Sequence, residues 1–222
     1  QVELFRSVKA GNGRVEIALT DGGTLSAAQV NDLSVAGTAN CYVVSAPGTY
    51  VFNARVRGNG AGEGVGFEPA IEMADGMTAD WLWTDSEGLV SGVALDTTSG
   101  DIFLTVGEGR GNALVALMQD GKVVWSWHVW VTDAPQTMTY GNGTVFMDRN
   151  LGAVGTTAGG TDAYGMYYQW GRKDPFYGGE KTETSANAFL EAKNGTVVNP
   201  AYPALDWAFS KSATTTDGAA AT

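Results

Sequence analysis

One segment, residues 113–131, limits the fold of this chain more than any other, because it has the pattern of a tight β-hairpin. Two apolar runs, ALVALM and VVWSWHVWV, flank the pair Asp120-Gly121. This pair suits a type I′ turn, in which both central residues need a positive φ angle. The sequence therefore predicts two paired antiparallel strands at this point of the chain.

The strand after this turn has two unlike faces. Side chains alternate between faces along a strand, and one parity is entirely apolar and predicted to be core: Val123, Trp125, Trp127, Val129 and Val131. The other parity is mixed and carries His128, which is predicted to be hydrogen-bonded within the fold or to face solvent, with a functional role as the alternative. Trp81 and Trp83 also share a parity. They are predicted to pack in a core, with an exposed aromatic platform as the alternative.

Similar strand-sized segments recur throughout the first region, roughly every 8–12 residues. The chain of 222 residues contains 31 glycines, and its 17% of charged residues is below the ~25% typical of soluble proteins. This pattern predicts a β-sandwich of about seven to nine strands. The run of strands ends at Asp133-Ala134-Pro135, so two domains are predicted, 1–135 and 136–222.

The second region has a different texture. A further hairpin is predicted around Asn142-Gly143, followed by a polar, Gly-rich loop at 156–165. The apolar spacing at 185–193 predicts a short helix that ends before Asn194-Gly195. The low-complexity end, 211–222, is predicted to be mobile.

The formal net charge of −11 excludes some classes of partner. Phosphate binding needs clustered Lys and Arg, so neither a nucleic acid nor an anionic membrane surface is expected. No apolar run approaches the ~18 residues of a membrane span. Cys41 and His128 are the single cysteine and histidine, which excludes an internal disulfide and a zinc-finger site. Cys41 is predicted to be a buried small side chain, with a reactive thiol as the alternative.

The second region resembles a known family. The motifs GTVFMDRNLGA at 143–153 and AYGMYYQWGRKDPF at 163–176 are similar to the two signatures of the Fibrobacter succinogenes major paralogous domain, and Asp206-Trp207 matches its usual Asp-Trp pair. Such domains are similar in design to C-type-lectin-like folds and normally continue past this pair, so a truncated module is expected. As a block, the motifs imply a framework role for Asp148, Arg149, Asn150, Gly171, Pro175 and Trp207.

The first region resembles fimbrillin-like and other surface proteins of Bacteroidota, through ANCYVVSAPGTYVF at 39–52. The two resemblances imply a mainly β fold class: an N-terminal immunoglobulin-like β-sandwich followed by a partial C-type-lectin-like α+β module. They also imply an extracellular location or one on the outer membrane surface.

The motifs offer little chemistry for catalysis. Asp148 and Asp174 would serve as an acid/base pair for glycoside hydrolysis only if they were held ~5–10 Å apart, and the sequence does not fix that distance. The second region has no cysteine of the kind that sulfatase-modifying enzymes use, and no pattern that activates a nucleophile. We therefore expect no catalytic residues and no cofactor. Asp148, Asn150 and Asp162 carry the oxygen ligands that calcium prefers, with a hydrogen-bonded loop as the alternative.

The stretch YYQWGRKDPF has the side chains of a glycan site, because sugars stack on aromatic rings and hydrogen-bond to planar polar groups. The candidate ligand-binding residues are Tyr167, Trp170, Arg172, Asp174 and Tyr177. The competing interpretation is a framework role. Side chains of an extended YYQW alternate in direction, so at most half face one ligand, and Arg172 and Asp174 are spaced to pair across Gly171.

The sequence therefore predicts a non-catalytic cell-surface protein for adhesion or ligand binding. One form of this hypothesis associates the protein with a fimbria. Its expected partner is a glycan or a host or bacterial surface protein, without direct insertion into a membrane. The alternative is a structural subunit of a pilus or another extracellular filament, because an incomplete β domain leaves an edge that a neighbouring subunit's strand can fill. A glycan-active enzyme is the third hypothesis.

Overall fold

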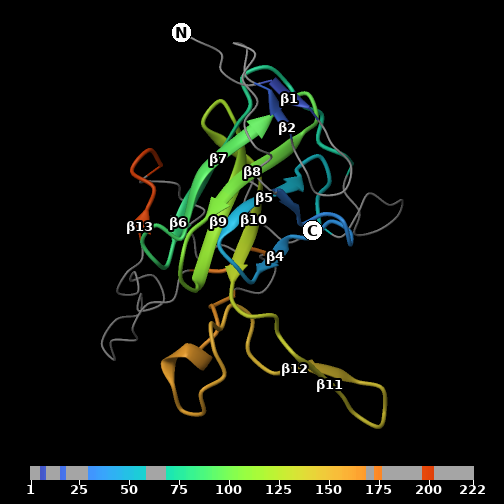
Figure 1. Ribbon diagram of the computed structural model, residues 1–222, viewed down its shortest axis with the longest axis vertical. Coiled ribbons are helices and arrows are strands. Elements are labelled where there is room, and N and C mark those ends of the chain that lie inside the picture. Colours follow the sequence, from blue (N-terminus) through green and yellow to red (C-terminus); the bar gives the residue numbers. More distant parts are fainter. Residues whose placement is uncertain are drawn as a thin grey trace.

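The computed structural model describes residues 6–8, 16–18, 30–58, 69–168, 173–176 and 197–202. Over these ranges the chain is mainly β, as predicted, and its one helical segment there is the 3-10 turn η1 (Thr161–Ala163). A β body carries a hairpin that projects from one end (Figure 1). No helix in the described ranges is long and apolar enough to cross a membrane.

Two sheets make up the body. The larger has the strand order β13-β6-β9-β10-β4 and the smaller β3-β5-β8-β7. The larger sheet consists of β4 (Cys41–Val44), β6 (Thr78–Thr84), β9 (Gly111–Gln119), β10 (Lys122–Val131) and β13 (Val197–Val198). The smaller sheet consists of β3 (Val30–Asp32), β5 (Gly48–Asn53), β7 (Val90–Asp96) and β8 (Asp101–Val106). Neighbours are antiparallel except for the parallel pairs β4 with β10 and β3 with β5.

Two further strand pairs lie outside these sheets. They are β1 (Arg6–Val8) with β2 (Glu16–Ala18), and β11 (Thr137–Thr139) with β12 (Val145–Met147). The second pair is the projecting hairpin of Figure 1, and it confirms the hairpin predicted around Asn142-Gly143.

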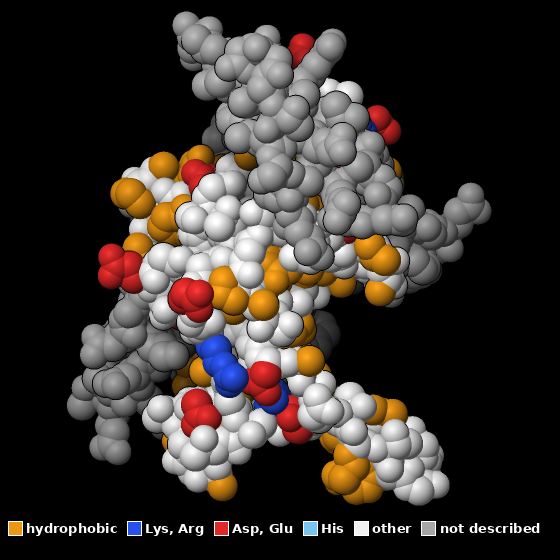
Figure 2. Space-filling view, viewed as in Figure 1, with side chains coloured by type: hydrophobic (Ala, Val, Ile, Leu, Met, Phe, Trp, Pro, Cys, Tyr) orange, Lys and Arg blue, Asp and Glu red, His pale blue; other side chains and the backbone are white. Residues whose placement is uncertain are grey.

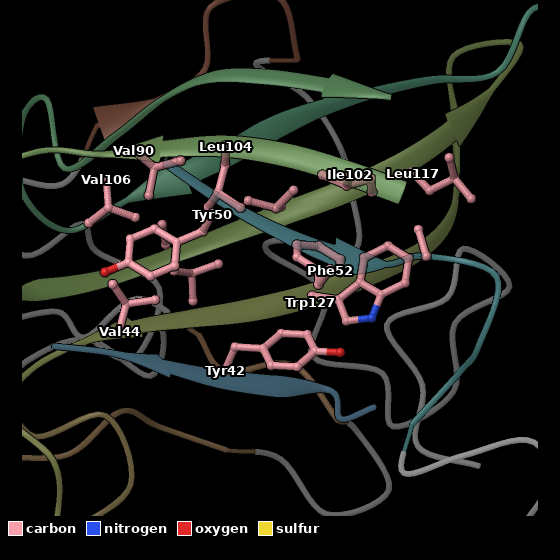
Figure 3. Close-up of a cluster of buried hydrophobic side chains, with 14 of the residues drawn as sticks. Tyr42, Val44, Tyr50, Phe52, Val90, Ile102, Leu104, Val106, Leu117 and Trp127 are labelled. Carbon is pink, nitrogen blue, oxygen red and sulfur yellow. The ribbon is translucent and has the colours of Figure 1, made fainter. Parts of the chain in front are cut away.

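The main core lies between the two sheets and explains why they pack face to face. The Phe52 ring from the smaller sheet lies 5.1 Å, centroid to centroid, from both Tyr42 and Trp127 of the larger sheet (Figure 3). Ile102 and Leu104 of β8 are fully buried beside them. Burying apolar side chains on facing sheets is the main driving force for a sandwich of this kind.

The β9–β10 hairpin confirms the strongest sequence prediction. Asp120 and Gly121 both have positive φ angles, 52° and 74°, as a primed turn requires. Trp125 and Trp127 point into the main core as expected.

Two β-bulges correct the predicted strand faces. The register of β10 shifts between Val123 and Trp125, so Val123 belongs to a second cluster on the outer face of the larger sheet. The register of β6 shifts between Trp81 and Trp83. Trp81 therefore packs against the main core while Trp83 is buried in the second cluster. A bulge inserts one residue into a strand and so reverses the parity beyond it.

The outer face of the larger sheet is covered by the second region of the chain. The second cluster, which includes Trp83, Leu114 and Met118, is packed by Met166 and Tyr202. Strand β13 also pairs with the edge of β6. The two regions predicted as separate domains therefore share one sheet and one apolar layer.

Candidate functional site

A row of hydrogen-bonded polar side chains crosses the outer face of the larger sheet. Cys41 and His128 are opposite each other in β4 and β10, with Sγ 3.2 Å from Nδ1. His128 Nε2 lies 2.9 Å from Asn112 Oδ1. The Asn112 amide nitrogen donates to Asp85 Oδ2 at 2.8 Å and to the Gly152 carbonyl at 2.9 Å. Because that amide is the donor, Nε2 carries the imidazole proton and Nδ1 accepts from the thiol.

This Cys-His-Asn order resembles that of thiol proteases, but the electrostatics oppose an ion pair. Burial raises the pKa of the Cys41 thiol to about 12 and lowers the pKa of the His128 imidazole to about 3. The proton therefore stays on sulfur at neutral pH, and a neutral thiol is a poor nucleophile. No local pattern predicts this pairing, because the two residues are 87 positions apart.

The second motif is held against β10 by a buried charge pair. Lys173 Nζ donates to the Ser126 carbonyl at 2.8 Å and to Asp174 Oδ1 at 2.6 Å, and Ser126 Oγ donates to Asp174 Oδ2. The ammonium also lies 4.5 Å from the centroid of the Trp125 ring. Strand β4 pairs only with residues 128–131 of β10. Ser126 lies outside that paired stretch, and Lys173 donates a hydrogen bond to its carbonyl.

This arrangement changes the interpretation of Asp174. The residue is 1% exposed, so its carboxylate has almost no surface to offer a ligand, and its position favours the framework interpretation. Pro175 beside it is buried as well. The partner of Asp174 here is Lys173, which the sequence-based pairing with Arg172 overlooked.

The first motif is held by a second set of ion pairs, at the base of the hairpin. The Arg149 side chain is 2% exposed, and its guanidinium donates to Asp133 Oδ2 at 2.9 Å and to Asp148 Oδ1 at 2.8 Å. Arg110 also pairs with Asp133, at 2.8 Å. Hydrogen bonding from Arg149 lowers the pKa of Asp133 to about 2 and also lowers that of Asp148. These contacts support the framework role implied for Asp148 and Arg149.

The predicted calcium ligands are each engaged within the fold. Asn150 Nδ2 donates to the Ala163 carbonyl at 3.2 Å, and Asp162 accepts from the Thr157 backbone at 3.3 Å. A Cβ atom at Gly155 would collide with the Asp162 carboxylate, so this loop closes tightly around that side chain. Over the described ranges, no group of three or more His, Cys, Asp or Glu side chains is placed to hold a metal ion.

An open cleft lies between the hairpin and the Gly-rich loop, and we call it the hairpin cleft. Its volume is about 500 Å³, and it is lined by residues 146–151, 155–159 and Ala163. Figure 2 shows it as the hollow at the lower end of the molecule. Phe146 and Leu151 supply exposed apolar surface, while the charges of Asp148 and Arg149 offset each other. The cleft thus combines exposed apolar side chains with an offset pair of charges and two threonines, Thr156 and Thr157.

Exposed aromatic side chains are concentrated in the second region. Among the described residues, the large aromatic side chains with exposed surface are Tyr140, Phe146, Tyr164, Tyr167 and Tyr168. Tyr167, a predicted ligand-binding residue, is 40% exposed and forms a β-bridge with Phe176. The aromatic side chains that face the sandwich core are buried, except for the partly buried Trp81.

Several predicted residues lie outside the described ranges. They are Trp170, Gly171, Arg172, Tyr177 and Trp207, together with the predicted helix at 185–193 and the tail at 211–222.

Comparison with known proteins identifies no relative: no family model, curated protein or solved structure matches the chain. The family resemblances of the two regions therefore stay predictions.

Proposed function

We propose that this chain is a non-catalytic cell-surface protein for adhesion or ligand binding, and that its ligand is a glycan bound in the hairpin cleft. The observation that carries the proposal is that, among the described residues, the largely exposed aromatic side chains all lie within 140–168, and that one of them, Phe146, lines the cleft. Rings with free faces bind the C–H faces of sugars, and the offset charges suit an uncharged ligand. The cleft volume of about 500 Å³ also falls in the ~300–1,000 Å³ range of small-ligand sites.

The states of the ionisable groups support a binding role over a catalytic one. The carboxylates of Asp133 and Asp148 are held ionised by Arg149, whereas a general acid at neutral pH needs a raised pKa. The Cys41 thiol is held protonated. Neither pattern matches a residue prepared for proton transfer near pH 7.

The finer fold and the location belong to the same proposal. We assign the sandwich to the immunoglobulin-like type, and residues 136–222 to a lectin-like module on the outer surface of a cell. The similarity of both regions to surface-protein motifs supports this assignment, as do the ion pairs of Arg149 and of Lys173, which attach the described parts of the two motifs to the sandwich.

A glycan array followed by calorimetry tests the proposal. Wild-type chain is expected to bind a neutral oligosaccharide, and Leu151→Ala to bind it 10- to 100-fold more weakly, because one apolar contact is worth ~1–3 kcal/mol. Leu151 lines the cleft and is 41% exposed, so its truncation leaves the core intact. The matched control is Val35→Ala, which removes an exposed apolar side chain on the sandwich. Absence of binding, or equal losses in both variants, would contradict a site in the cleft.

A filament subunit is the second candidate function. The observation that favours it is the β11–β12 pair, whose residues are exposed throughout both strands. An uncovered strand edge can accept a strand from another subunit. Electron microscopy of the purified chain at high concentration would show polymers if this function holds and none if it does not.

A further inference from the structure

We propose that Asp148 determines which sugars the hairpin cleft accepts: its carboxylate takes a hydrogen bond from a hydroxyl of a neutral sugar and rejects sugars that carry acid groups. This inference rests on the proposed function, because it names the class of glycan that the cleft binds. Arg149 is the matching positioning residue, since it orients the carboxylate while its own charge stays out of reach of the ligand.

The two charges of the cleft are unequally exposed. Among the described residues that line it, two are charged, Asp148 and Arg149. The Asp148 side chain is 29% exposed, whereas that of Arg149 is 2% exposed. The buried guanidinium is hydrogen-bonded to the carboxylates of both Asp148 and Asp133. The charges offset each other at a distance, but a ligand inside the cleft contacts the carboxylate and not the cation.

The geometry of the ion pair fixes the Asp148 carboxylate and leaves it able to accept a further hydrogen bond. Arg149 Nε donates to Oδ1 at 2.8 Å, and Nη2 donates to Oδ2 at 3.0 Å. This two-point contact sets the plane of the carboxylate. An ionised carboxylate has about four acceptor positions. Arg149 takes two of them and the Gln136 backbone also interacts with the group, so acceptor capacity remains for a sugar hydroxyl.

The charge state of Asp148 explains why an acid group would be rejected. Hydrogen bonding from Arg149 lowers the pKa of Asp148, so the carboxylate is ionised at neutral pH and acts only as an acceptor. A hydroxyl can donate to it, whereas a second carboxylate brings the same charge and no proton. Such a repulsive contact is a common source of specificity. The net charge of −11 opposes acidic ligands in the same sense.

The apolar part of the cleft lies close enough to bind the same sugar. Phe146 is two positions before Asp148, and both line the cleft. An extended chain advances about 3.3 Å per residue, so their backbone positions are at most ~7 Å apart. The Phe146 side chain is 56% exposed. A sugar that stacks its C–H face on this ring therefore has hydroxyls at its edge within reach of Asp148.

Calorimetry with a matched pair of ligands tests this inference. The first ligand is the neutral oligosaccharide selected on the array, and the second is the same oligosaccharide with its primary alcohols oxidised to carboxylates. The wild type is expected to bind the neutral form at least ~10-fold more tightly, because two carboxylates in contact repel each other. Asp148→Asn removes the charge, and it is expected to weaken binding of the neutral form and to reduce the preference to about 3-fold or less.

The matched control is Asp133→Asn. It removes the other carboxylate that Arg149 contacts, and Asp133 does not line the cleft. This variant is expected to keep the wild-type preference, which separates the charge in the cleft from the stability of the hairpin base. Asp148→Glu retains the charge and is expected to keep the preference as well. The near-UV circular dichroism of the buried tryptophans checks that every variant is folded.

Three results would overturn the inference while leaving a glycan site in place: acidic glycans as the main hits on the array, an unchanged preference in Asp148→Asn, or an equal loss of preference in Asp133→Asn and Asp148→Asn. Absence of any bound glycan on the array would instead overturn the proposed function, and this inference with it.

Discussion

Buried polar side chains on the outer face of the larger sheet carry most of the residue-scale chemistry. His128 is held between Cys41 and Asn112, and Asn112 is fixed in turn by Asp85. Each side chain forms a hydrogen bond with a buried polar neighbour. Without that hydrogen bond the neighbour would be buried with no partner, which costs ~1–3 kcal/mol. The row therefore stabilises one specific arrangement of these side chains.

The first prediction concerns the pH dependence of stability. Burial lowers the pKa of His128 to about 3, against ~6.5 in the unfolded chain. Between these values the unfolded chain binds a proton that the folded chain excludes, so the free energy of unfolding falls as pH falls. We expect urea titrations to show a loss of roughly 1.5 kcal/mol between about pH 6.5 and about pH 5. This interval lies above the range in which Asp133 titrates. His128→Gln should flatten this dependence, and an unchanged slope would contradict the assignment.

The second prediction concerns the reactivity of Cys41. With its thiol pKa raised to about 12, its thiolate fraction near pH 8 is roughly three orders of magnitude below that of a free cysteine. We expect alkylation by iodoacetamide to be slower by a similar factor in the folded chain than in urea. Rapid, saturating alkylation of the folded chain near neutral pH would instead indicate a thiolate paired with a protonated imidazole, and would revive the enzyme hypothesis.

At the scale of elements, two charged clamps attach the loops of the second region to the sandwich. Lys173 and Asp174 attach the second motif to β10, and Arg149 attaches the first motif to Asp133, just beyond the end of that strand. Both clamps use residues from the motifs that the sequence singled out, so the framework interpretation of those motifs has a structural basis.

The third prediction concerns the buried clamp on β10. Lys173→Met leaves Asp174 as a buried charge without its ammonium partner, and we expect it to lower the free energy of unfolding by about 3–5 kcal/mol. The double variant Lys173→Met, Asp174→Leu should recover at least half of that loss, because an apolar pair replaces the ion pair. Chemical unfolding of both variants measures the difference, and equal losses would argue against a coupled pair.

The fourth prediction concerns the clamp at the base of the hairpin. Arg149→Lys cannot make the paired contacts of a guanidinium with two carboxylates, so the hairpin should open more often. We expect hydrogen exchange at the amides of Tyr140 and Asp148 to accelerate about tenfold, with β9 and β10 unaffected. Arg110→Lys, at a side chain that is 53% exposed, is the control and should have little effect. Equal acceleration in both variants would show that the bidentate geometry is not what matters.

The elements also show where sequence reasoning succeeds and where it stops. The Asp120-Gly121 turn was predictable because its φ angles depend on local residue chemistry. The faces of Val123 and Trp83 were not, because bulges depend on the register of a neighbouring strand. The contacts of Cys41 with His128 and of Lys173 with Ser126 join distant positions, and no local pattern encodes them. The hairpin cleft is different, because its lining segments 146–151 and 155–159 are close in sequence, and what the sequence left open is how these loops fold against each other.

At the scale of the whole molecule, the two regions are integrated more closely than the change in sequence texture indicated. A strand from the second region extends the larger sheet, and its apolar side chains complete a layer over Trp83 and Leu114. Folding of the second region onto the sandwich fixes the base of the hairpin and thereby one wall of the cleft. The sequence predicted which kinds of element form, whereas the way these elements pack against each other depends on tertiary contacts.

The most direct test of the account is a two-dimensional NMR titration of the isotope-labelled chain with a neutral oligosaccharide selected on the array. We expect shifts confined to residues 146–151 and 155–159, and an oligosaccharide that is recovered intact after prolonged incubation. Shifts centred on Cys41 and His128, or a cleaved oligosaccharide, would contradict a non-catalytic binding site in the hairpin cleft.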